Sequence, residues 1–133
     1  MVLSFCLAFL WPLAGRADTV CPEPREAGHW EVSEKAQLGE LTKLEVRHGC
    51  TETGKEVWHI RALASCHPRD CTWGVAAAHL LKGRLVAVFE TFTAERWISL
   101  RLDGDSLNAD VYIKPHNGKR KPTRYSRQMV RDR

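Results

Sequence analysis

The sequence contains no apolar run of the roughly 20 residues that a membrane-spanning helix requires. Its longest apolar run, Val2–Ala14, is shorter than that and is followed by the small-residue segment Gly15-Arg16-Ala17. A short apolar core before small residues is typical of a secretory signal peptide. We therefore expect residues 1–17 to be a signal peptide, residues 18–27 to be an N-terminal extension, and the protein to be secreted or periplasmic, without a transmembrane segment.

Motifs of the common catalytic classes are also missing. The chain has no Gly-x-Ser-x-Gly elbow, no glycine-rich phosphate loop, no His-Glu-x-x-His and no Cys-x-x-Cys pair, which are the patterns that expose a nucleophile, hold a phosphate or hold a metal. Its six histidines are scattered along the sequence. We predict a protein that is not an enzyme and that uses no cofactor.

A third absence concerns helices, because no segment of ten or more residues has a convincing apolar stripe at helical spacing. Most of the chain instead alternates apolar and polar residues, with turn residues about every 10 to 15 positions, as in a β-meander. Segment 56–65 has this alternation, and Asp103-Gly104-Asp105-Ser106 joins segments 96–102 and 107–114 as a hairpin. The alanine-rich segment 75–81 is helix-prone, but it turns directly into the strand-like segment 85–93, so we expect a strand there too.

Eight strands are expected in all, the first around Trp30 and the last at residues 123–131. Strands joined in sequence by short turns pair each with its neighbour, and closing such a sheet removes its exposed edges. We predict an all-β protein with one domain, residues 28–131, folded as an antiparallel up-and-down eight-stranded barrel. An open sandwich is the alternative, which periodicity does not separate from a barrel.

Five cysteines are present, and cleavage of the signal peptide removes Cys6. The other four suit two disulfides in an exported protein. The short spacing around Pro68 favours Cys66–Cys71, which leaves Cys21–Cys50, although the sequence does not exclude the other two pairings. A zinc site formed by Cys66, His67, Asp70 and Cys71 is an alternative; an oxidising compartment favours the disulfide, and we predict no metal.

The basic residues are concentrated at the C-terminal end. The last 20 residues contain eight lysines and arginines and a single acid, Asp132. A solvated, basic terminal strand explains this clustering, and an acidic surface is the partner that it would suit. The residues that we expect to face such an acidic surface are Lys119, Arg120, Lys121 and Arg124. Nucleic acid is an unlikely partner, because export argues against it and few aromatic residues lie among the basic ones.

Two motifs resemble known families. Gly28-His29-Trp30, with Arg127 or Arg131 near the end of the chain, is similar to the Gly-x-Trp and terminal Arg of the calycin barrels, the lipocalin-like and avidin-like proteins. That resemblance implies structural roles for Gly28, Trp30 and Arg127, with the tryptophan plugging one end of the barrel and an arginine packed across it.

The segment Cys66-His67-Pro68-Arg69-Asp70-Cys71-Thr72-Trp73-Gly74 resembles a Cys-x-Pro-x-x-Cys-Asp-Trp-Gly signature of small secreted bacterial proteins. Thr72 stands here where the signature has aspartate. These proteins look like avidin-type barrels, so the resemblance implies a fold and does not name a ligand.

A small barrel either fills with side chains or keeps room for one ligand at its mouth. Aromatic side chains suit a sugar or an apolar ring, and the candidates for the mouth are Trp58, Trp73, Phe89, Phe92, Trp97 and Tyr112. We predict a secreted binding module that recognises a small molecule or saccharide, chiefly through Trp58, Trp73, Trp97 and Tyr112. The alternative is a protein-interaction or inhibitor module that presents the Cys66–Trp73 loop, in which Trp73 would point outward beside Arg69 as an interface anchor.

Overall fold

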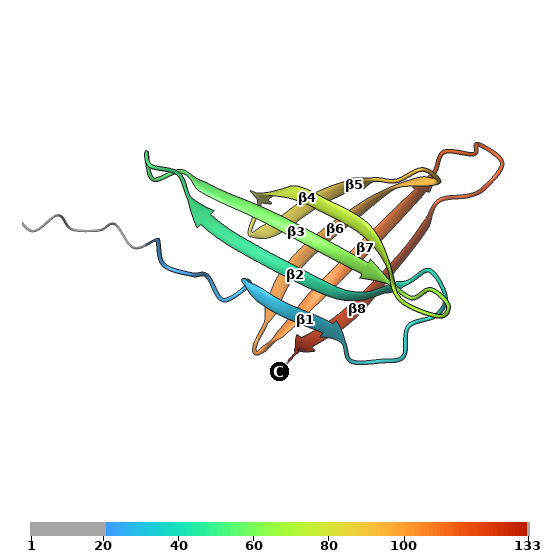
Figure 1. The fold of residues 1–133 in the computed structure, drawn as a ribbon, viewed down its shortest axis with the longest axis horizontal. Coiled ribbons are helices and arrows are strands. Elements are labelled where there is room, and N and C mark those ends of the chain that lie inside the picture. The colour runs from blue at the N-terminus through green and yellow to red at the C-terminus, as the bar shows by residue number, and fades with distance from the viewer. Residues whose placement is uncertain (1–20, 133) are drawn as a thin grey trace, which may run out of the picture.

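The structure is a computed structural model that describes residues 21–132, in which eight strands close into a barrel and no helix is present (Figure 1). Each strand pairs antiparallel with the next, and the first pairs with the last. The strands are β1 (Gly28–Val32), β2 (Leu41–Cys50), β3 (Glu56–Ala64), β4 (Cys71–Leu81), β5 (Arg84–Glu90), β6 (Ala94–Asp103), β7 (Ser106–Pro115) and β8 (Thr123–Arg131). The predicted up-and-down barrel is confirmed, and the alanine-rich segment is a strand.

The expected signal peptide, residues 1–17, lies outside the described residues, as does the start of the expected extension. Within residues 21–132, no helix is long and apolar enough to cross a membrane.

The barrel interior is built from alternate residues of each strand, because successive side chains of a strand point to opposite faces. In β3, Trp58, Ile60 and Ala62 are buried, whereas the residues between them are exposed. β2 departs from strict alternation at its start, where Thr42 does not share a face with Leu44 and Val46. A register shift between Leu41 and Lys43 places Leu41 in the core, and the Thr42 hydroxyl donates instead to Asp70 Oδ2 at 2.8 Å.

Because the strands run alternately up and down, successive connections lie at opposite ends of the barrel. One end, which we call the mouth, carries residues 33–40, 65–70, 91–93 and 116–122. The other end, the base, carries residues 21–27 and the turns at 51–55, 82–83 and 104–105. A ligand that binds at the mouth therefore contacts residues of these connections.

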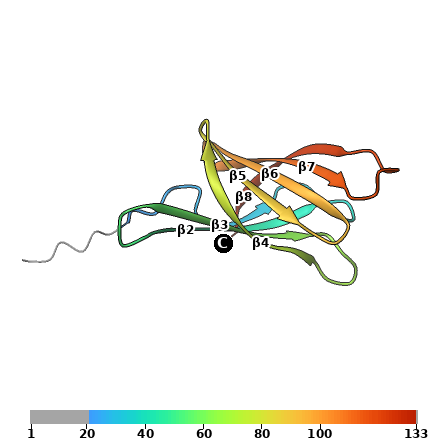
Figure 2. The same ribbon diagram turned by 90° about the horizontal axis from the view of Figure 1, so that it is seen from above.

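Two of the eight strand pairings are short. β1 and β8 form three residue pairs, and β4 and β5 form four, all of them next to the base. Toward the mouth β4 and β5 separate, and Figure 1 shows them diverging from their shared turn. β1 instead ends at Val32, so the mouth half of β8 has no partner strand on that side. The mouth therefore has two lips, one made by β1–β4 and the other by β5–β8, which lie apart at the right of Figure 1; Figure 2 shows the same end from above.

The base is closed around Trp30. This side chain is 1% exposed, and its indole N–H donates to the carbonyl of Glu26 at 2.9 Å. Of the two arginines considered for the packing across it, Arg131 lies over the ring, 4.4 Å from its centroid. Arg127, which the resemblance favoured, lies near the mouth over Tyr125 instead, because its position on β8 is four residues farther from the base.

Gly28 is expected to resist substitution. Its φ is +127°, and a Cβ built there lies 2.9 Å from a terminal nitrogen of Arg131. Gly28→Ala should lower the free energy of unfolding by about 2 to 3 kcal/mol, because backbone strain adds to displacement of the Arg131 guanidinium. Gly54→Ala is the matched control, since Gly54 has a φ of +81° but open space around it; it should cost only about 1 kcal/mol in guanidinium denaturation. Equal losses would contradict the steric part of this account.

Candidate ligand site at the barrel mouth

The four aromatic residues expected to bind ligand do not gather in one place. Trp97 and Tyr112 are cross-strand neighbours on the outer face of β6 and β7, where they line an external recess of about 370 Å³. Trp58 is buried toward the base, with its ring 4.5 Å from that of His48. Trp73 alone lies inside the barrel near the mouth. Trp97 also lines a second recess together with Trp73, and ligand binding by any of the four stays a prediction.

Both disulfides have the favoured pairing, Cys66–Cys71 and Cys21–Cys50. With their sulfurs joined, Cys66 and Cys71 offer no thiolate to a zinc ion, and Asp70 accepts the hydrogen bond from Thr42. Trp73 is 8% exposed and packs edge-on against Phe89, with ring centroids 6.2 Å apart. The Cys66–Trp73 loop therefore lacks the outward aromatic anchor that its reading as an interface required.

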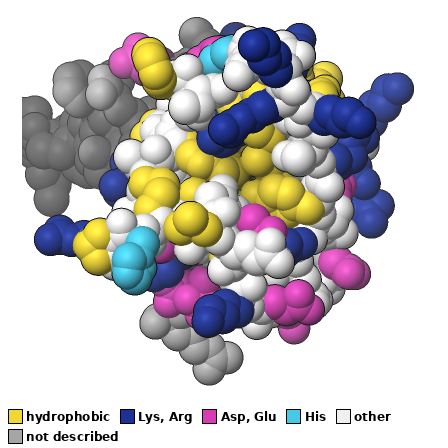
Figure 3. Space-filling model, turned by 90° about the vertical axis from the view of Figure 1, so that its right-hand side faces the viewer, with side chains coloured by type: hydrophobic (Ala, Val, Ile, Leu, Met, Phe, Trp, Pro, Cys, Tyr) yellow, Lys and Arg dark blue, Asp and Glu magenta, His cyan; other side chains and the backbone are white. Residues whose placement is uncertain are grey.

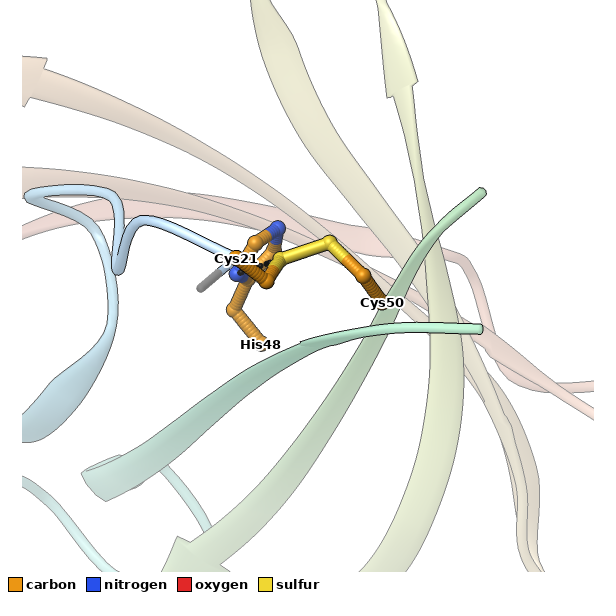
Figure 4. Close-up of side chains that lie close together, drawn as sticks. All are labelled: Cys21, His48 and Cys50. Atoms are coloured by element: carbon orange, nitrogen blue, oxygen red, sulfur yellow. Dashed lines mark hydrogen bonds between the residues drawn. A yellow bond between two sulfur atoms is a disulfide. The ribbon is translucent and has the colours of Figure 1, made fainter. Parts of the chain in front are cut away.

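Another cluster with metal-ligand chemistry occurs within the described residues. Cys21, His48 and Cys50 lie side by side in Figure 4, and their potential ligand atoms are within 4.8 Å of one another. Cys21 and Cys50 are joined as a disulfide, so His48 is the single free ligand of this set. In its oxidised form the cluster is a covalent link between the N-terminal segment and β2.

The lips of the mouth are each held together by their own loops. On one lip, the amide of Gly39 donates to Ser65 O at 2.7 Å and that of Ser65 donates to Glu40 O at 2.8 Å. On the other, the amide of His116 donates to Thr93 O at 3.0 Å. Each pair of loops therefore forms one unit, and contacts between the units decide how the mouth is closed.

Of the contacts that cross from one lip to the other, three involve the side chains of Tyr125, Arg127 and Arg96. The Leu41 amide donates to the hydroxyl oxygen of Tyr125 at 3.0 Å, and the Arg127 guanidinium pairs with Glu40 Oε2 at 2.6 Å. In the third, the guanidinium of Arg96 lies 5.1 Å from the ring centroid of Trp73. Burial raises the pKa of Tyr125 above its ordinary value, so its hydroxyl is neutral at physiological pH. Apolar core residues pack inside the barrel on the base side of these contacts.

Arg96 is a partly buried arginine of this site without an acidic partner among the described residues; Arg120, which is exposed at the rim, forms no ion pair there either. Arg96 is inward-facing and half-buried, and no carboxylate among the described residues lies within salt-bridge distance of it. Its terminal nitrogens donate to the hydroxyls of Thr91 and Thr93, while its Nε is buried without a hydrogen-bond partner. Burial lowers the pKa of Arg96. A desolvated guanidinium with unused donors gains most from an anion.

A recess of about 550 Å³ lies against Arg96, between residues 91–93 and 116–122. Its lining includes Phe92, Ile113, His116 and Arg120. Phe92 is 99% exposed, and such full exposure is unusual for a large apolar side chain. Figure 3 looks onto this end of the molecule and shows an apolar centre with lysine and arginine side chains around and across part of it. The recess thus combines an aromatic surface with positive charge.

The C-terminal basic residues divide between two places. Lys119, Arg120 and Lys121 are exposed in the loop from β7 to β8, at the mouth. Arg124 lies on the outer face, 5.0 Å over the ring of Tyr112. The first three add positive potential beside the recess, whereas Arg124 belongs to the external surface.

Sequence reasoning missed Arg96, although a signal was present. Arg96 is in phase with Ile98 and Leu100, so alternation alone places its guanidinium on the apolar face of that strand. A charged residue at an inward position near a strand end marks a functional candidate. Phe92 was included among the mouth aromatics and does line the recess.

Comparison with known proteins gives no relative: no family model, no curated protein and no solved structure matches this chain. The resemblance to avidin-like and lipocalin-like barrels and the cysteine signature therefore rest on the motifs alone.

Proposed function

We propose that this protein is a non-enzymatic binding module that takes a small organic anion at the mouth of its barrel. The ligand would be a compound with an acidic group on a ring or on a saccharide skeleton. Its acidic group would pair with Arg96, and its apolar part would lie against Phe92 and Ile113. Two disulfides support work outside the cytoplasm.

The observation that carries the proposal is the buried Nε of Arg96, which has no hydrogen-bond partner. The other arginines that reach toward the interior have partners: Arg127 pairs with Glu40, and Arg131 donates to the carbonyl of Ala27 at 3.0 Å. Arg96 keeps buried donor capacity beside an open recess instead. Hydrogen bonds between a guanidinium and an anion are about twice as strong as neutral ones. A bound anion would therefore provide the charged acceptor that the protein does not provide for Arg96.

Two dyes of similar shape and different charge test the proposal. 8-Anilinonaphthalene-1-sulfonate carries a sulfonate, and N-phenyl-1-naphthylamine is its uncharged parent. We expect fluorescence titration to show tighter binding of the sulfonate dye than of the uncharged dye. Arg96→Met should lower the affinity for the sulfonate dye by about tenfold or more. Binding of the uncharged dye should change by no more than about twofold.

Arg101→Gln is the matched control, because Arg101 is an exposed arginine on the same strand and its loss changes the net charge equally. If Arg101→Gln weakens the sulfonate dye as much as Arg96→Met does, the dye is bound by general positive charge and the assignment of Arg96 is wrong. If neither dye binds at all, the recess is not a ligand site.

A further inference from the structure

The edge of β4 that faces β5 is open toward the mouth. Continuing the β4–β5 register past the Ala78–Ala87 pair would set Ala77 opposite Val88, Ala76 opposite Phe89 and Val75 opposite Glu90, but these pairs do not form. On its other edge, β4 remains paired with β3 over the same residues. The backbone groups of residues 75–77 and 88–90 that point into the gap therefore have no strand partner within the sheet.

β4 also differs from the other strands in composition. It is the one strand of the barrel without an aspartate, glutamate, lysine or arginine, and it has no proline. Free edges are ordinarily protected by charges, proline or bulges. β4 has a bulge beside Trp73, but the residues from Val75 onward run in regular register without such protection. This open edge is therefore fit to pair with another strand.

The gap between β4 and β5 is a groove and not a filled seam. Trp73 and Phe89 touch edge-on and close it on the inner side. Outside them lies a space of about 560 Å³ whose walls include Val75, Val88 and Trp97. Val75 is 64% exposed and Trp97 is 41% exposed. The groove thus has an aromatic floor, apolar walls and unpaired backbone along two sides.

The mouth end of the groove carries two carboxylates, with His116 Nε2 3.5 Å from Glu90 Oε2 and Lys114 opposite Glu95 on β7. Glu90 is one of its lining residues, and Glu95 is its cross-strand neighbour on β6. Both side chains lie on the outer face, where a chain leaving the groove would pass them. Charge complementarity favours a basic residue at that end of an occupant.

We propose that this groove binds an extended peptide segment of a partner protein, apolar at alternate positions and carrying a lysine or arginine at the end near Glu90 and Glu95. The segment would add as a strand along Val75–Ala77 and Val88–Glu90, so that its backbone pairs with the two open edges. Alternate side chains would point toward Trp73 and Phe89, and the others would lie beside Val75 and Trp97.

The groove favours a peptide over the other occupants. A small apolar ligand would cover the aromatic floor but leave the backbone groups of both edges unpaired, which is costly when they are buried. A second copy of this protein would have to insert its β4 into the groove while that strand is still paired within its own barrel. The groove is bounded by a strand on each side, so it accommodates a single extended chain more readily than it accommodates the wall of a second barrel.

The test uses a fluorescein-labelled peptide of sequence Thr-Val-Thr-Val-Thr-Lys and a second peptide with the same side chains but N-methylated valines. Strand pairing needs the amide hydrogens, so fluorescence anisotropy should show a Kd on the order of 100 µM for the first peptide and binding about tenfold weaker or worse for the second. Hydrogen exchange of the native protein should slow in residues 75–77 and 88–90 when the first peptide is added.

Val75→Lys places a charge on the open edge at an exposed position, and Val75→Thr keeps the branched shape as its control. We expect the lysine variant to lose about tenfold or more in affinity for the peptide and the threonine variant to stay within about threefold. Equal binding of both peptides would overturn the proposal, as would the absence of binding. So would a dimer of the native protein that Val75→Lys converts to a monomer, because a second copy would then cover the edge.

Discussion

Trp30→Ala is expected to lower the free energy of unfolding by about 3 to 5 kcal/mol, the range for deleting a large buried aromatic side chain. Trp30 is 1% exposed and packs in the core beneath the strands that close the barrel. β1 and β8 share three residue pairs, one of which is Trp30 with Arg131. Because this short pairing alone joins the first strand to the last, the deletion removes packing where backbone pairing is weakest.

Two further variants separate the contributions at this position. Trp30→Phe keeps most of the ring but leaves the carbonyl of Glu26 without its indole donor, so it should cost about 1 to 3 kcal/mol. Arg131→Gln removes the cation over the ring and should cost about 1 to 2 kcal/mol. Guanidinium denaturation followed by circular dichroism measures all three, and a loss below about 1 kcal/mol for Trp30→Ala would refute its role in closing the base.

The strands were predictable because their alternation reports burial directly. In segment 96–102, Ile98 and Leu100 share one parity and Trp97 has the other, and the structure buries the first two and leaves Trp97 on the outer face. The same alternation already set Trp97 apart from Trp58, which is in phase with Ile60 and Ala62. It does not place Trp73, which faces inward because of the bulge beside it. Grouping these tryptophans at one mouth rested on their being aromatic, and residue type does not decide which way a strand position faces.

The features that were not predictable depend on how strands meet across the closed sheet. The choice between Arg127 and Arg131 depended on where β8 crosses β1, because both have the inward parity. The two lips of the mouth arise where β4 and β5 separate after four residue pairs, and local sequence does not report how far a pairing extends. The recess beside Arg96 joins a turn and a loop about 25 residues apart along the chain.

Replacing both Cys21 and Cys50 with serine is expected to cost more than replacing Cys66 and Cys71. The two disulfides close loops with sequence separations of 29 and 5 residues. A cross-link restricts the unfolded chain more when its loop is longer, so the loop-entropy relation gives about 3.5 kcal/mol for Cys21–Cys50 and about 2 kcal/mol for Cys66–Cys71. Guanidinium denaturation of the two double variants measures both losses, and intact mass after alkylation confirms that the remaining disulfide is formed.

The Cys21–Cys50 disulfide also anchors residues 21–27, the segment that hydrogen-bonds to Trp30. Residues 21–27 supply the carbonyls of Glu26 and Ala27 to Trp30 and Arg131, and Arg25 donates to the carbonyl of Gly104 at 2.9 Å. If the disulfide holds these groups in place, the serine variant and Trp30→Phe remove overlapping contributions, and their combined loss should fall short of the sum by about 0.5 to 1 kcal/mol. Strict additivity would mean that Cys21–Cys50 acts on the unfolded chain alone, while the segment docks on the base through its own hydrogen bonds.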